Sequence, residues 1–248
     1  MSAFQIRISR RSFLQAAGLT ALAGGLAACG STAQSTAPSA SAPAYSLEDA
    51  VKAEFTDSGI TLSPENASGC TVEGTALTIT AAGTYAVSGS CADGSIQVEK
   101  GVEDVTLVLD GLTLTSTTTA PLVCGKNSGV TLAAADGTEN ALTDTEANNK
   151  DNANASEDAE SAVVKCKDGS QVVLCGTGTL NLHAVGKNGI KSGTTEEDRD
   201  ASLTIRALTL NIDAPVNDAI NAEQQLNVES GTLNIAAGDD ALHCDLYL

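Results

Sequence analysis

Three polar residues occupy the same position in three similar segments of the chain. Asn188, Asp218 and Asp240 each lie two residues before the central apolar residue of a short strand motif. If these segments stack, the side chains form a column at one corner, because neighbouring strands lie about 4.8 Å apart. Carboxylates at that spacing repel each other unless a cation or a proton lies between them. With Asp239 beside the column, two interpretations stay open: a calcium site, or a turn ladder in which Asn and Asp bond their own backbone.

A second set of polar residues is predicted on the outer surface of the same strands. Side chains alternate along a strand, so the residue between two inward positions points outward. Amines, amides and imidazoles at such positions can bind the carboxylates and hydroxyls of sugars, although the solvent face of an ordinary strand looks the same. The predicted row consists of Lys165, Lys191, Asn221 and His243.

Composition argues against several other kinds of chemistry. The chain has 13 Lys plus Arg against 31 Asp plus Glu, with no Trp, so it lacks the basic, aromatic surface that binds nucleic acid. Two His and no C-x-x-C pair offer too few ligands for the usual zinc sites. No G-x-S-x-G elbow or P-loop is present, and with so many acids a chance carboxylate pair says nothing about glycoside hydrolysis. Composition and motifs therefore give little support to catalysis.

A repeat of three short strands must position these residues. The motif Leu203-Thr204-Ile205 is followed after seven residues by Leu210-Asn211-Ile212 and later by Ala219-Ile220-Asn221-Ala222, and the same order recurs before and after it. Repeats of roughly 20 to 30 residues with three strands and no helix are typical of a parallel β-helix, in which each coil buries its apolar side chains against the next. The pattern predicts an all-β, right-handed, single-stranded parallel β-helix, with a β-sandwich as the less favoured fold. The last predicted strand stops at Leu248, so a C-terminally truncated helix is also expected.

The N-terminal segment resembles a signal peptide for protein export. Arg10 and Arg11 precede an apolar run of about eleven residues, too short to span a bilayer, and the run ends in the lipobox-like sequence before Cys29. We expect a twin-arginine lipoprotein signal over residues 1–28, lipidation of Cys29, a flexible tether over 29–45 and the β-domain over 46–248. The mature protein would then be an extracytoplasmic, membrane-anchored lipoprotein on a bacterial cell surface.

Three local features complete the prediction. Ser46 and Asp49 have capping-box spacing, which favours one short helix ahead of the apolar residues from Val51. Acidic residues 144–160 and 193–200 are typical of solvated loops inserted into coils. Cys70 and Cys91 are candidates for a disulfide outside the cytoplasm, although sequence alone does not determine the pairing.

Several motifs together resemble a family of bacterial carbohydrate-binding domain-containing proteins. They are Ala82–Gly89, Asp104–Leu112, Ala135–Asp144, Gly176–Leu180, Asn188–Ser192 and Asp239–Leu242. The resemblance covers most of the chain from about residue 60. It implies a right-handed β-helix similar to that of pectate lyases, calcium ions between coils, and non-catalytic binding of polysaccharide, including acidic polysaccharide such as polygalacturonate.

With this resemblance, calcium becomes the favoured interpretation of Asn188, Asp218, Asp239 and Asp240. The alternatives are a calcium-dependent polysaccharide lyase and a structural or adhesion protein of the surface. For a lyase, the arginine base of pectate-lyase-like enzymes would have to be Arg199 in an acidic insert or Arg206 at a turn.

Overall fold

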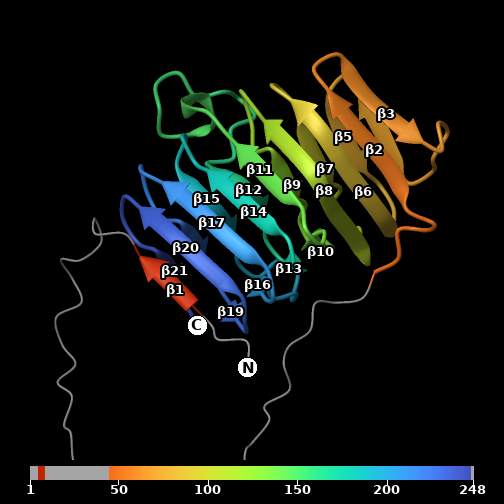
Figure 1. Cartoon of the computed structure of the whole chain (residues 1–248). Helices are drawn as coiled ribbons and strands as arrows, with labels where there is room; N and C mark the ends of the chain where they lie inside the picture. Colours follow the sequence, from red (N-terminus) through yellow and green to blue (C-terminus); the bar gives the residue numbers. More distant parts are fainter. Residues whose placement is uncertain (1–4, 9–44, 247–248) are drawn as a thin grey trace, which may run out of the picture.

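The computed structural model describes residues 5–8 and 45–246. These residues fold almost entirely into β-strands (Figure 1), and the one helix among them is a single 3₁₀ turn, η2, at Glu146–Asn148. The strands are β1 Gln5–Ile8, β2 Val51–Thr56, β3 Gly59–Ser63, β4 Cys70–Glu73, β5 Ala76–Ile79, β6 Gly83–Cys91, β7 Ser95–Val98, β8 Val105–Thr115, β9 Leu122–Cys124, β10 Gly129–Ala134, β11 Glu139–Thr143, β12 Ala162–Cys166, β13 Gln171–Gly176, β14 Thr179–His183, β15 Asn188–Ser192, β16 Ser202–Ile205, β17 Thr209–Ala214, β18 Ile220–Ala222, β19 Leu226–Val228, β20 Thr232–Ala237 and β21 Leu242–Cys244.

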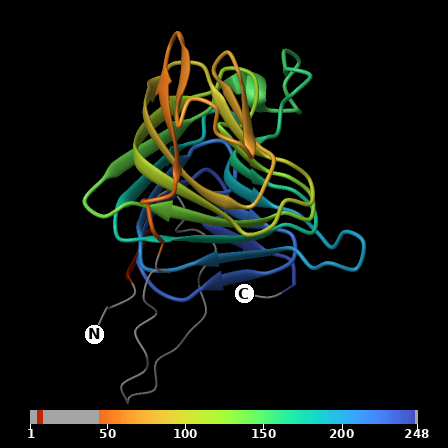
Figure 2. The same ribbon diagram turned by 90° about the vertical axis from the view of Figure 1, so that its right-hand side faces the viewer.

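Two mainly parallel sheets organise these strands, and the β2–β3 and β4–β5 pairs are antiparallel. From β10 onward the chain forms triplets, and each strand pairs in parallel with the corresponding strand of the next triplet, as β10–β13–β16–β19, β11–β14–β17–β20 and β12–β15–β18–β21. The long strand β8 joins the first two series, so both belong to one sheet, while the third series extends through β9, β7, β5 and β4 to form the other. Both views show the strands of successive repeats stacked in layers around one interior (Figures 1 and 2). The prediction of an all-β protein with parallel strands is confirmed.

The strand register agrees with the sequence repeat. Leu203 pairs with Leu226, and Leu210 pairs with Leu233. Equivalent apolar side chains therefore fall into inward columns, and Leu203, Leu210 and Ile220 are each 0% exposed. Burying such columns is the main stabilisation available to a fold without helices.

The predicted helix after Ser46 is wrong. Tyr45–Ala50 contains bends only, and β2 then pairs with both β3 and β6. Ala53 and Phe55 are each 1% exposed, while the alternating residues Lys52 and Glu54 are exposed. The period-two alternation that begins at Val51 therefore outweighs the capping pattern.

The two predicted loops are inserted between strands, and most of their residues are at least partly exposed. Residues 144–161, called the insert from here on, join β11 to β12 and contain the fully buried Asn148 (green in Figure 1). In the second loop, over residues 193–200, Glu196 lies 3.1 Å from the ammonium of Lys126, and Arg199 pairs with Glu103. Some side chains of both loops are therefore held by partners within the protein, which the sequence did not predict.

The six cysteines of the described residues are free thiols, including Cys70 and Cys91. Burial raises the pKa of Cys70 above its usual value. Cys124 and Cys166 pair in register and are each 0% exposed, so these two cysteines are small inward side chains. No helix of the described residues is long and apolar enough to cross a membrane.

Candidate functional site

The four residues predicted to form an outer row lie side by side on the second sheet. Lys165 pairs in register with Lys191, Lys191 with Asn221, and Asn221 with His243. All four side chains are partly exposed, whereas the residues flanking them on each strand face the interior. We call Lys165, Lys191, Asn221 and His243 the outer row.

The two lysines of the outer row have different surroundings. The ammonium of Lys191 lies 3.0 Å from a carboxylate oxygen of Glu223. Lys165 makes no ion pair or hydrogen bond with the described residues, and the nearby Glu160 is bound by Lys167 at 2.7 Å. Burial lowers the pKa of Lys165, and the neighbouring charge of Lys191 lowers it further. Lys165 is therefore the cation of the row whose interactions are least satisfied within the protein.

The other end of the row is held by carboxylates. Nε2 of His243 lies 2.8 Å from Asp245, and Nδ1 lies 3.5 Å from Asp240. The hydrogen bond with Asp245 and the contact with Asp240 raise the pKa of His243. Asn221 donates to Asp218 at 2.6 Å, so the outer row touches the acidic corner directly.

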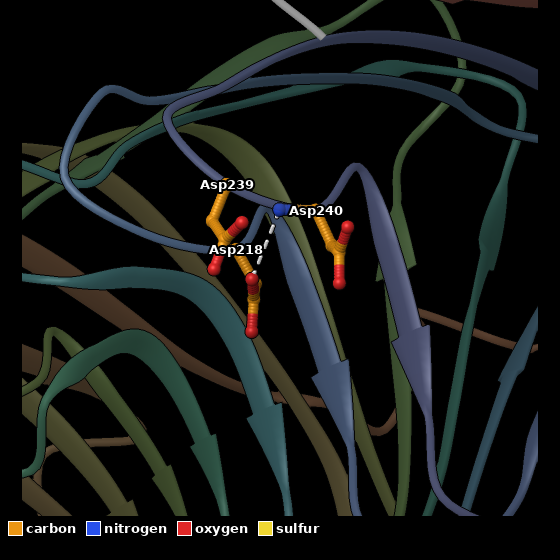
Figure 3. A group of neighbouring side chains, drawn as sticks. All are labelled: Asp218, Asp239 and Asp240. Carbon is orange, nitrogen blue, oxygen red and sulfur yellow. Dashed lines mark hydrogen bonds between the residues drawn. The ribbon is translucent and has the colours of Figure 1, made fainter. Parts of the chain in front are cut away.

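The structure brings together the three carboxylates among the four predicted metal ligands. Oxygen atoms of Asp218, Asp239 and Asp240 all lie within 4.8 Å of one another, and we call this group the acidic corner. The carboxylates come from the turns before β18 and β21, and Figure 3 shows those of Asp218 and Asp239 close together. Convergent carboxylates from adjacent coils are the arrangement that a hard cation such as Ca²⁺ requires.

Hydrogen bonds from neighbouring residues also engage the carboxylate of Asp218, although they are not the bonds to its own backbone that define a turn ladder. Asp218 is 5% exposed, and its two oxygens accept from the backbone N–H of Asp240 at 3.1 Å and from Asn221. Asp239 and Asp240 are exposed. The carboxylate of Asp218 thus has a structural role in the absence of any cation, and a cation would use its remaining lone pairs.

Asn188 lies outside the acidic corner. Its side-chain oxygen accepts from Asn217 at 2.8 Å, and its amide donates to the backbone oxygen of Ser161 at 2.8 Å. The side chain of Asn188 therefore links residues of neighbouring turns and does not bond its own backbone. The predicted export and lipidation residues Arg10, Arg11 and Cys29 lie outside the described residues.

Sequence analysis missed the acidic residues that surround the outer row. Glu160 comes from the insert and Glu223 from the turn after β18. Neither lies on a repeated motif, and only the fold shows that their carboxylates contact lysines near the row. Without these contacts, Lys165 and Lys191 are indistinguishable in the sequence.

The fold and this polar face are those of a stacked β-sheet protein that carries a row of polar side chains across adjacent strands. The family model for "Carbohydrate-binding domain-containing protein" matches residues 73–246, and the chain therefore belongs to that family.

Two known proteins are similar to the chain. A carbohydrate-binding domain-containing protein of Acetivibrio thermocellus is 31% identical over 144 residues, covering 58% of this chain and 49% of the relative. The chain thus spans about half the length of this curated relative. A solved structure of a polysaccharide lyase-like protein from C. thermocellum, a gadolinium derivative, superposes with a TM-score of 0.57 at 24% identity, covering 80% of this chain and 96% of that chain. The latter likeness concerns the fold alone.

Proposed function

We propose that this protein is a surface-anchored, non-catalytic module that binds acidic polysaccharide of the polygalacturonate type, with calcium. The proposed scaffold is a right-handed parallel β-helix. The observation that carries the proposal is the unpaired, half-buried ammonium of Lys165 in the outer row. Membership of a carbohydrate-binding family supports a polysaccharide partner.

The shape of the outer row suits a chain-like ligand. Four polar side chains repeat across adjacent coils at about 4.8 Å, so successive groups of an extended polymer meet successive side chains. Stacking of sugar rings on aromatic side chains contributes little, because the chain has no Trp and three Tyr. Polar and ionic contacts must therefore supply the affinity.

The charge of the protein sets a condition on this binding. A formal charge of −18 repels a polyanion at long range, so local positive charge must outweigh it at the site. Lys165 supplies one such charge, whereas that of Lys191 is largely offset by Glu223. Calcium at the acidic corner would supply another and would bridge the corner to a uronate.

The lysine test compares two variants of the outer row. Lys165→Gln should weaken binding to polygalacturonate about tenfold, the effect of losing one charge-assisted contact. Lys191→Gln should have a smaller effect, because Lys191 already has a carboxylate partner. Lys100→Gln, on an exposed lysine paired with Glu197, is the control. Equal affinity of Lys165→Gln and the wild type in calorimetric titration would refute the proposal.

The calcium test uses thermal unfolding. A cation that binds only the folded state adds about 2.7 kcal/mol at a hundredfold excess over its dissociation constant, so millimolar Ca²⁺ should raise the Tm. Asp239→Asn should reduce that increase, and Asp213→Asn, which alters an exposed carboxylate outside the corner, should not. If adding EDTA does not change the Tm, the calcium interpretation is refuted and only the turn-ladder interpretation remains.

A calcium-dependent polysaccharide lyase is the second candidate. The observation in its favour is again Lys165, because an amine with a lowered pKa can accept a proton from a uronate. Prolonged incubation with polygalacturonate distinguishes the two functions: a lyase releases an unsaturated product that absorbs ultraviolet light, whereas a binding module releases none. If neither binding nor product is found, the structural or adhesion function gains support.

A further inference from the structure

A pocket outside the outer row lies between the insert and the turns that follow β14 and β17. Its volume is about 890 Å³, within the range of about 300 to 1,000 Å³ that is usual for small-ligand sites. The insert supplies one wall, including Glu146, Asn152 and Asn154, and the turns supply Val185 and Val216.

The insert is fixed against the coils by buried amides. The amide of Asn148 donates to Asp144 at 2.8 Å and to the backbone oxygen of Ala162 at 2.9 Å, while its oxygen accepts from the backbone of Glu160 at 2.7 Å. Asn149 donates to the backbone oxygen of Gly186 at 3.1 Å, across the base of the pocket. The wall is therefore preorganised, which lowers the entropic cost of binding a ligand.

The opposite side of the pocket presents apolar groups to solvent. Val185 is 42% exposed and Val216 is 52% exposed. Leu246 is the third exposed large hydrophobic side chain of the described residues, so two of the three border this one pocket. Single exposed apolar residues are ordinary, but two that share a polar pocket indicate a surface that a ligand covers.

The charges of the pocket differ from those of the outer row. Its lining contains no Lys or Arg, and the nearby Lys187 is paired with Asp151. The exposed carboxylate of Glu146 has no ion pair with the described residues, and Asp144 lies beneath it in the lining. An anionic ligand is repelled here, while amides and a carboxylate can bind hydroxyl groups.

We propose that this pocket is a subsite for a neutral sugar residue, with C–H groups of the ring on Val185 and Val216 and hydroxyls on Glu146 and the insert amides. Asn148 connects the pocket wall directly to the start of β12, the strand that carries Lys165. Together with the proposed uronate function of the outer row, on which this step rests, the ligand is a polysaccharide that contains both neutral and acidic residues.

The test separates the two sites by ligand and by variant. Neutral methyl hexosides and pentosides, and neutral oligosaccharides of the same sugars, are titrated into the full chain while the methyl signals of Val185 and Val216 are followed by NMR. The double variant Val185→Ser/Val216→Ser should lose about tenfold in affinity for the neutral ligand, since it removes apolar contact at two exposed positions. Leu246→Ser is the matched control, and Glu146→Gln is compared with Glu157→Gln, which alters an exposed insert residue outside the lining.

Each result has a definite meaning. Neutral-sugar binding that is weakened by the valine variant but not by Lys165→Gln supports the subsite. No response of the valine signals to any neutral ligand, or equal affinity in the valine variant, overturns it. Loss of polygalacturonate binding in Lys165→Gln alone concerns the outer row, so failure of that function is distinguishable from failure of the neutral subsite.

Discussion

Two faces of the same coil stack use polar side chains in different ways. On the β11–β14–β17–β20 face, Asn211 donates to Asn181 at 2.7 Å and accepts from Asn234 at 2.7 Å. Each amide in this ladder satisfies the next. On the β12–β15–β18–β21 face, the equivalent row contains Lys191 and His243, whose partners come from turns, and Lys165, which has no ion pair or hydrogen bond with the described residues.

The difference shows how a repetitive fold separates stability from recognition. A ladder of identical residues bonds to itself, so it stabilises the stack and offers little to a ligand. In a row of unlike residues, neighbouring side chains do not all hydrogen-bond to one another. The donors and acceptors that stay unpaired are available to bind a ligand. Three experiments sharpen or break this comparison, in decreasing order of expected effect.

The largest effect is expected in the asparagine ladder. Asn211→Ala removes two short hydrogen bonds and leaves Asn181 and Asn234 each without one partner, which should lower the free energy of unfolding by about 1–3 kcal/mol. Asn227→Ala is the control, because exposed Asn227 makes only one long contact, 3.5 Å to Thr204, and should change stability by less than about 0.5 kcal/mol. Urea unfolding measures both, and equal values would show that the ladder is not a stabilising element.

An intermediate effect is expected from Lys165. Its folded-state pKa is below 10.5, so the charged amine costs stability at neutral pH, and that cost falls as the pH rises from the folded pKa towards 10.5. Lys165→Met should therefore be more stable than the wild type at neutral pH, with a gap that narrows in that alkaline window. Lys100→Met, in which an exposed lysine is changed, should show no such narrowing. A destabilised Lys165→Met would mean that the ammonium stabilises the fold.

Much of the fold is predictable from the sequence because inward columns repeat. The offsets from Leu203 and Leu210 give the strand pairing found in the structure. The repeat is harder to see in the coil formed by β10 and β11, because its second strand carries Asn140 where the neighbouring coil has Leu180. Asn140 is 1% exposed, and its oxygen accepts from the backbone N–H groups of Gly111 and Leu112. The hydrogen bonds from this distant backbone allow Asn140 to occupy an inward position, and the repeat is hidden because a polar residue stands where an apolar one is expected.

The candidate site is predictable only in part, for a related reason. Register alone aligns Lys165 with Lys191 and brings Asp218 near Asp240. The sequence does not show that Asn188 bonds to Asn217 or that Glu223 binds Lys191. It also gives no sign that Asn148 folds the insert into a pocket wall. These contacts join turns of different coils, and no local pattern encodes them.

The smallest effect is expected from His243, at the exposed end of the outer row. Its hydrogen bond with Asp245 raises the pKa above 6.5, so the positive charge of the imidazolium is lost only as the pH rises through that raised value. Affinity for polygalacturonate should fall by a few-fold across that step in the wild type, because the polymer stays ionised throughout and only the protein loses charge. His243→Gln should bind with a flatter profile.

Protonation of His243 should also weaken calcium binding at the acidic corner. Nδ1 of His243 lies 3.5 Å from Asp240, so a charged imidazole competes electrostatically with a cation at the acidic corner. In EDTA the affinity for polygalacturonate should therefore decrease as the pH rises. In millimolar Ca²⁺ this decrease should be smaller or reversed, because a bound cation replaces the positive charge of the lost proton. Titrations from pH 5 to 9 in both conditions measure this exchange. If the affinities of the wild type and His243→Gln depend on pH in the same way in EDTA, His243 does not take part in binding. If the affinity of the wild type depends on pH in the same way with and without Ca²⁺, calcium at the acidic corner does not affect binding at the outer row.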